Sequence, residues 1–265
     1  MTSPSEEFAK YPYYDAKIQK NQAYRPDDGE HIKPIGYFSE IKGTTVIKIA
    51  TSIFIKDLRL CIPPFLGIIA VWFFIVLIIA LPYFSLLVAN AIGISSVFVF
   101  IFIEGWTVAA SSNAIRMESA KIGKSLLVMF KKFPKLLAVA AIYLFLISPV
   151  IAWTLLLPEE AFLRIELLRF MTDLIGILFN VLFMFLIPLL MISEQSFVSA
   201  FTKSVRFFIK TMSTDPSFTL ILIYYYIFGY YFFYFTFFYF IFFPLVYPVI
   251  VLARVLYLKV NFSIF

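Results

Sequence analysis

The chain alternates between long uncharged runs and short segments rich in lysine and arginine. Four runs carry no charged residue: 60–103, 136–158, 174–193 and 216–253. A helix rises about 1.5 Å per residue and the hydrocarbon core of a bilayer is about 30 Å thick, so one crossing takes about 20 residues. The second and third runs therefore predict one transmembrane helix each, whereas the first and last are long enough for two.

The two longest runs contain signals for a turn. Pro82, Ser85 and Asn90 predict that the first run turns over 82–90. In the last run, tyrosines cluster around 229–236, and tyrosine prefers the level of the lipid headgroups. A turn there gives six transmembrane helices in three hairpins. The alternative for the last run is a single long, tilted helix whose tyrosines face the protein interior.

A basic amphipathic stretch followed by proline precedes each hairpin. The second and third stretches have apolar residues at helical spacing and lysines elsewhere, while the first is weaker. We expect helices that lie in the cytoplasmic interface and end at Pro134 and at Asp215-Pro216. Their apolar faces contact either the acyl chains or the bundle itself. The apolar positions are Val46, Ile49, Ala50 and Ile53; Ile122, Leu126, Met129, Phe130 and Phe133; and Phe197, Ala200, Phe201, Val205 and Phe208.

The stretches and hairpins form a weak internal repeat, in which Ser125 and Lys131 correspond to Ser204 and Lys210. The predicted modules cover 39–114, 115–192 and 193–258, between a flexible polar tail at 1–38 and a short tail at 259–265. This plan resembles a group of prokaryotic six-span membrane proteins and is similar to the membrane domain fused to some glycerophosphodiester phosphodiesterases. The resemblance implies a fold and no reaction.

Composition and charge support a membrane location. The sequence is 62% hydrophobic and 14% charged, whereas soluble domains carry about 25% charged residues. Among the 22 lysines and arginines, only Arg164 and Arg169 fall outside the segments predicted to share one side with both termini. Because basic residues concentrate on the cytoplasmic side, we expect a cell-membrane protein with both termini in the cytoplasm.

The sequence lacks the residues that most catalytic sites need. His31 is the only histidine and Cys61 the only cysteine, so no zinc-hydrolase motif, serine triad or thiolate cluster can be built from this sequence. No phosphate-binding glycine-lysine loop occurs. We therefore expect a non-enzymatic protein with no metal and no cofactor.

A few polar residues within the predicted spans are candidates for an intramembrane site. A charged side chain there costs about 2.5–3.5 kcal/mol, so Glu104 must be protonated, paired or hydrated. Arg254 is the candidate partner, and a pair would join the first hairpin to the third. The alternative places Glu104 at the interface, where it reaches water. The other polar candidates are Asn113, Asn180 and Asp173.

The function expected from these features is a membrane scaffold or complex subunit that contacts anionic lipid. Membrane lipids are the expected partners, other membrane proteins or further copies of the chain are candidates for assembly, and no nucleic acid is expected. A transporter or channel component that uses Glu104 is the alternative, and a lipid-acting intramembrane enzyme is the third class. The residues expected to contact headgroups are Lys121, Lys124, Lys131, Lys132, Lys203, Arg206 and Lys210.

Overall fold

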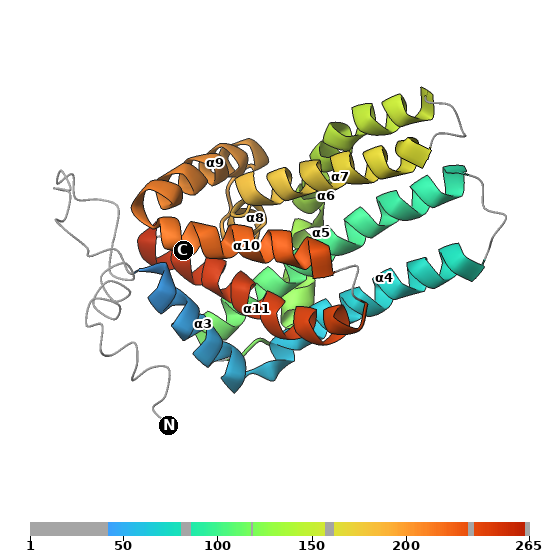
Figure 1. Cartoon of the computed structure of the whole chain (residues 1–265). Coiled ribbons are helices and arrows are strands. Elements are labelled where there is room, and N and C mark those ends of the chain that lie inside the picture. The colour runs from blue at the N-terminus through green and yellow to red at the C-terminus, as the bar shows by residue number, and fades with distance from the viewer. Residues whose placement is uncertain (1–41, 81–85, 118, 157–161, 233–235, 263–265) are drawn as a thin grey trace. The chain divides into compact units, whose positions relative to one another are not determined.

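The structure is a computed structural model and describes residues 42–80, 86–117, 119–156, 162–232 and 236–262 (Figure 1). The predicted tail at 1–38 lies outside these residues. The described part is helical and contains no strand, which confirms the all-α class. Its elements are α3 (Gly43–Lys56), η1 (Leu58–Cys61), α4 (Ile62–Ala80), α5 (Leu86–Met117), α6 (Ile122–Leu156), α7 (Phe162–Leu182), α8 (Leu186–Ile192), α9 (Phe197–Thr214), α10 (Pro216–Phe232) and α11 (Thr236–Asn261).

Within the described residues, three helical stretches are long and apolar enough to cross a membrane: Val97–Arg116, Ile122–Val150 and Phe243–Asn261. Leu174–Leu182 and Leu186–Ile192 make a fourth if the bent pair is one span. Two shorter apolar helices, Leu58–Ala70 and Pro216–Ile227, accompany them. A helical membrane protein is therefore supported, and the full count of six spans stays a prediction.

Two proline signals have opposite outcomes. Pro216 begins α10 directly after α9 ends, as expected, because the first helical turn does not need the N–H that proline lacks. The expectation that Pro134 ends a helix is wrong, since α6 continues through both Pro134 and Pro149. The side chain of Ser148 donates a 2.8 Å hydrogen bond to the carbonyl of Phe145, the carbonyl that Pro149 deprives of its helical donor.

Each amphipathic segment docks on the bundle. The α3 helix packs against α11, the start of α6 packs against α5, and α9 packs against α8 and α10. Of the predicted apolar stripes, the members that become buried are Val46, Ala50, Ile53, Met129, Ala200 and Phe208. The docking alternative is therefore correct for the inner face of each segment. The end of the bundle that carries α3, the start of α6 and α9 is called the basic end below.

Close packing between helices depends on three glycines in the described residues, and one of them is Gly43, where a Cβ would collide with Phe218 of α10. A Cβ on Gly105 in α5 would lie 2.6 Å from Leu136 Cδ1, and Leu136 is buried in α6. A Cβ on Gly67 in α4 would lie 2.9 Å from Ile103 Cγ1 in α5. By contrast, a Cβ on Gly123 meets no atom within 4 Å. Gly105 and Gly67 therefore let α6 and α4 approach α5 on two sides.

Polar contacts link the end of one amphipathic segment to the start of the next. Asp57 Oδ2 accepts a 2.6 Å hydrogen bond from the backbone N–H of Ala120, just before α6. Asp215 follows α9 and accepts from the N–H of Gly43, which begins α3. Lys135 in α6 donates a 2.8 Å bond to the carbonyl of Gln195, just before α9. At the basic end, the first module therefore contacts the second, the second contacts the third, and the third contacts the first.

The hydrogen bonds that the Asp57 side chain accepts favour the ionised form of its carboxyl group. The side chain is 5% exposed and also accepts from Arg59 Nε at 2.7 Å and Arg59 Nη2 at 3.1 Å. Burial alone would raise the pKa of this carboxyl, but the bonds from Arg59 and Ala120 outweigh burial and hold the pKa below its ordinary value. The carboxylate therefore fixes the turn between α3 and η1 to the start of α6.

Candidate functional site

The site begins with a break in the fourth predicted span. Pro188 in α8 has no backbone N–H, so the carbonyl of Met184, four residues earlier, loses its helical hydrogen-bond donor. The chain bends by 45° between α7 and α8 at this point. Met184 is buried, and a buried carbonyl requires a replacement donor.

Arg254 of α11 supplies that donor. Its Nη1 lies 2.8 Å from the Met184 carbonyl, 2.7 Å from Tyr226 Oη in α10 and 2.8 Å from Glu104 Oε1 in α5. The side chain of Arg254 is 1% exposed and that of Glu104 is 16% exposed. The guanidinium also lies 5.9 Å from the centroid of the Tyr226 ring. One buried charge of α11 therefore joins groups from α5, from α10 and from the break between α7 and α8.

The predicted ion pair between Glu104 and Arg254 is present. It joins the first module to the third, as expected from the scarcity of charges in the uncharged runs. The contact with Met184 adds the second module, which the sequence did not predict. Glu104 is paired with Arg254, and its side chain is 16% exposed. Its position at the membrane interface stays a prediction.

None of the three comparisons, with family models, curated proteins or solved structures, finds a match for this chain. The site must therefore be interpreted from its geometry. No group of three His, Cys, Asp or Glu side chains that could hold a metal occurs in the part of the chain that the structure describes.

The other predicted polar residues do not join this cluster through any described contact. Asn113 Nδ2 donates a 2.9 Å bond to Ser125 Oγ and so links α5 to the start of α6. Asn180 Nδ2 donates to the carbonyl of Gly176 one turn earlier, at 2.9 Å. Asp173 lies within α7, and its side chain is outside the described part of the structure. Asn113 and Asn180 thus have local structural partners.

Two features of the cluster are not among the residues predicted from the sequence. Tyr226 belongs to a run of tyrosines in which no single member stands out. The Met184 carbonyl is a backbone group, and Pro188 is the signal that would have found it. The aromatic residues also pack in a defined arrangement. Tyr247 is buried, and its ring stacks on the ring of Phe243 with their centroids 4.6 Å apart.

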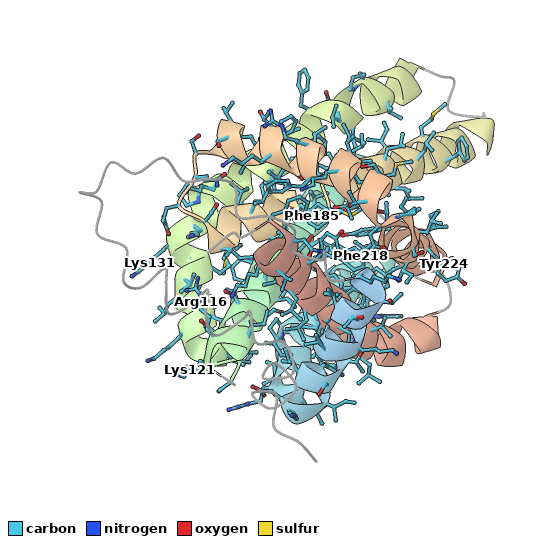
Figure 2. The ribbon with its side chains drawn as sticks, turned by 90° about the vertical axis from the view of Figure 1, so that its left-hand side faces the viewer. Arg116, Lys121, Lys131, Phe185, Phe218 and Tyr224 are labelled. Carbon is cyan, nitrogen blue, oxygen red and sulfur yellow. The ribbon has the colours of Figure 1, made fainter. Side chains whose placement is uncertain are left out.

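Most residues expected to contact headgroups are exposed at the basic end, and Figure 2 shows Lys121 and Lys131 pointing away from the helices. Lys132 differs from that expectation. Its Nζ donates 3.1 Å bonds to the carbonyls of Met191 and Ser193 and lies 3.0 Å from Glu194 Oε1. Lys132 thus caps the end of α8 inside the protein, and its hydrogen bond and positive charge lower the pKa of the Glu194 carboxyl.

The exposed half of 122–133 divides into two flanks. Leu127 and Phe130 are 64% and 53% exposed, whereas Lys124 and Lys131 lie on the adjoining side of the helix. A third side, which includes Ser125 and Met129, is buried against α5. This segment therefore presents one apolar and one basic flank to its surroundings.

The α9 helix repeats this division. Val198, Ile209 and Met212 are 73%, 61% and 57% exposed and lie along one side of the helix. Lys203, Arg206 and Lys210 follow the adjoining side, while Ala200, Ser204 and Phe208 are buried. Exposed large apolar side chains beside a basic stripe are typical of helices that lie at a membrane surface.

Proposed function

We propose that this chain is a non-enzymatic six-span membrane protein that acts as a scaffold or complex subunit and holds anionic lipid at its basic end. The observation that carries the proposal is the shared division of 122–133 and α9 into buried, apolar and basic sides. The apolar flank enters the acyl region while the lysines reach the headgroup phosphates. The orientation with both termini in the cytoplasm completes the proposal, because anionic lipid gives the cytoplasmic leaflet its negative surface potential.

The basic flank of 122–133 allows a direct test. In detergent micelles that contain equal amounts of phosphatidylglycerol and phosphatidylcholine, we expect the wild-type protein to retain phosphatidylglycerol preferentially. The Lys124→Gln/Lys131→Gln variant should lower that preference roughly thirtyfold, since each of the two lysines contributes about 1 kcal/mol near an anionic surface. Native mass spectrometry of the protein–lipid complexes measures the ratio.

The matched control for this test is Arg164→Gln/Arg169→Gln, which removes two charges from the segment predicted to lie at the opposite side. This control should keep the preference for phosphatidylglycerol. An equal loss in both double variants would mean that total charge, and not the flank of 122–133, selects the lipid, and the proposal would be rejected.

One observation supports a second candidate, a transporter or channel component. A backbone carbonyl at the bend between α7 and α8 lies beside a buried ion pair, and transporters commonly use broken helices next to buried charges. In this candidate, Glu104 carries a proton or cation. Its partial exposure supplies the contact with the surroundings that such a role requires.

Proton flux distinguishes this candidate from the first. In liposomes loaded with a pH-sensitive dye, a transporter of this kind should conduct protons, and Glu104→Gln should abolish the flux. Glu194→Gln makes the same chemical change at a carboxylate that is 88% exposed and should leave the flux unchanged. A wild-type protein that gives no flux above empty liposomes would remove this candidate as stated.

A further inference from the structure

Arg254 uses only one of its donor groups in the described structure. Nη1 makes all three short contacts, whereas Nε and Nη2 are buried and have no hydrogen-bond partner among the described residues. A buried donor without a partner destabilises the folded state, and more strongly when the group is charged. Such a group in a native protein calls for an explanation by a ligand, an ion or ordered water.

The unpartnered nitrogens have a defined geometry. The N–H bonds of Nε and one N–H of Nη2 are parallel and form the edge of the guanidinium that binds two oxygen atoms of a carboxylate or phosphate. Glu104 contacts Arg254 through Nη1 and therefore leaves this edge free. The ion pair is thus a single contact, and the stronger two-bond arrangement remains available to another anion.

Glu104 is the member of the ion pair that reaches the surface of the described structure. The Glu104 side chain keeps 16% of its surface exposed although its partner is 1% exposed. Three phenol groups follow one another from Arg254: the Tyr226 hydroxyl contacts Arg254, the Tyr225 ring lies 5.8 Å from the Tyr226 ring, and the Tyr247 ring lies 6.5 Å from the Tyr225 ring. These groups suit a ligand whose anionic head is joined to an apolar body.

We propose that Arg254 is an anion-binding residue, whose Nε–Nη2 edge binds a carboxylate or phosphate group while Glu104 serves as its resident counter-ion on Nη1. The ligand and the Glu104 carboxylate then bind different nitrogens of the same guanidinium group. This assignment adds a ligand class to the ion pair, and it depends neither on the lipid flanks nor on proton transport.

Chemical rescue tests the proposal. Glu104→Gln removes the resident negative charge, so a carboxylate in solution should replace it and raise the melting temperature of the variant. We expect octanoate to raise that temperature by about 4 °C or more beyond its effect on the wild type. Octanol supplies the same chain without the charge and should not. Acetate tests whether a small soluble carboxylate suffices or an amphiphilic one is required.

Two controls separate Arg254 from other sites. Glu104→Gln/Arg254→Met lacks the guanidinium and should show no octanoate effect, whereas Lys124→Gln/Lys131→Gln in the Glu104→Gln background should keep it. Rescue that persists without Arg254 would overturn the proposal, and so would rescue by octanol. If neither octanoate nor acetate stabilises Glu104→Gln, the edge holds ordered water and no anion, and the proposal is wrong.

A binding measurement on the wild type covers the case in which Glu104→Gln does not fold. Equilibrium dialysis with labelled octanoate should give one site per chain that Arg254→Lys weakens about tenfold, since lysine keeps the charge and loses the two-bond edge. Unchanged binding in Arg254→Lys would exclude this edge as the site. Loss of the phosphatidylglycerol preference with intact octanoate binding would affect the lipid proposal alone.

Discussion

Replacing Arg254 by methionine is expected to destabilise the protein by about 3–5 kcal/mol, the cost of leaving one member of a buried ion pair without its partner. Three groups lose their donor at once: the Glu104 carboxylate, the Met184 carbonyl and the Tyr226 hydroxyl. At about 2–4 °C per kcal/mol, the melting temperature in detergent micelles should fall by about 10 °C. Thermal unfolding followed by intrinsic fluorescence measures this fall.

A double variant distinguishes the ion pair from the packing of the arginine side chain. Because a buried pair is often replaced by apolar residues at little cost, Glu104→Met/Arg254→Met should recover much of the lost stability. Arg59→Met is the matched control, as Arg59 also pairs with a carboxylate but is 59% exposed. If Arg254→Met costs no more than Arg59→Met, the guanidinium does not hold the modules together.

The pairing of Glu104 with Arg254 could be inferred from the sequence because charges are scarce in the uncharged runs. A buried ion has few possible partners there, and the cost of leaving it alone is high. The same logic cannot find Met184 or Tyr226. Pro188 marks the Met184 carbonyl as one without a helical donor, but the sequence does not say which side chain replaces that donor, and Tyr226 is one of three consecutive tyrosines.

The prolines show why the break in the fourth span was missed. Pro134, Pro149 and Pro188 each remove one helical hydrogen bond, and Pro134 and Pro188 both follow a run of apolar or basic residues. The α6 helix continues through the first two, while the chain bends before the third, where Arg254 can bind the freed carbonyl. The outcome depends on a donor from a distant helix, which local sequence does not encode.

The internal repeat was visible in the sequence at Ser125 and Ser204, and both side chains are buried at the basic end. The corresponding role of Asp57 and Asp215 was not visible. Leu136 stands at the equivalent position of the second module, and α6 continues there without a turn. A carboxylate at this position therefore accompanies a chain break, and an apolar residue accompanies a continuous helix.

The second large effect is expected at Asp57. Asp57→Ala removes the acceptor for the buried Ala120 N–H and the partner of Arg59 in one step. Hydrogen bonds to charged groups contribute about 1.5–3 kcal/mol, and an unsatisfied buried donor adds its own cost, so we expect a loss of about 3 kcal/mol. Asp57→Asn keeps one oxygen acceptor and should lose less. Melting temperatures at pH 7 compare the two variants with the wild type.

The pH dependence of this difference tests whether the charge of Asp57 is responsible. The folded-state pKa lies below the ordinary value of about 3.9, because the bonds from Arg59 and Ala120 outweigh burial. The carboxylate therefore contributes its full stabilisation above the ordinary pKa, and that contribution is lost as pH falls through the lower, folded-state pKa. The gap between wild type and Asp57→Asn should be constant from pH 8 to about 5 and should narrow below about 4. A gap that stays the same in acid would mean that the shape of the Asp57 side chain, and not its charge, joins the turn between α3 and η1 to the start of α6. The contacts between modules at the basic end would then depend on packing alone.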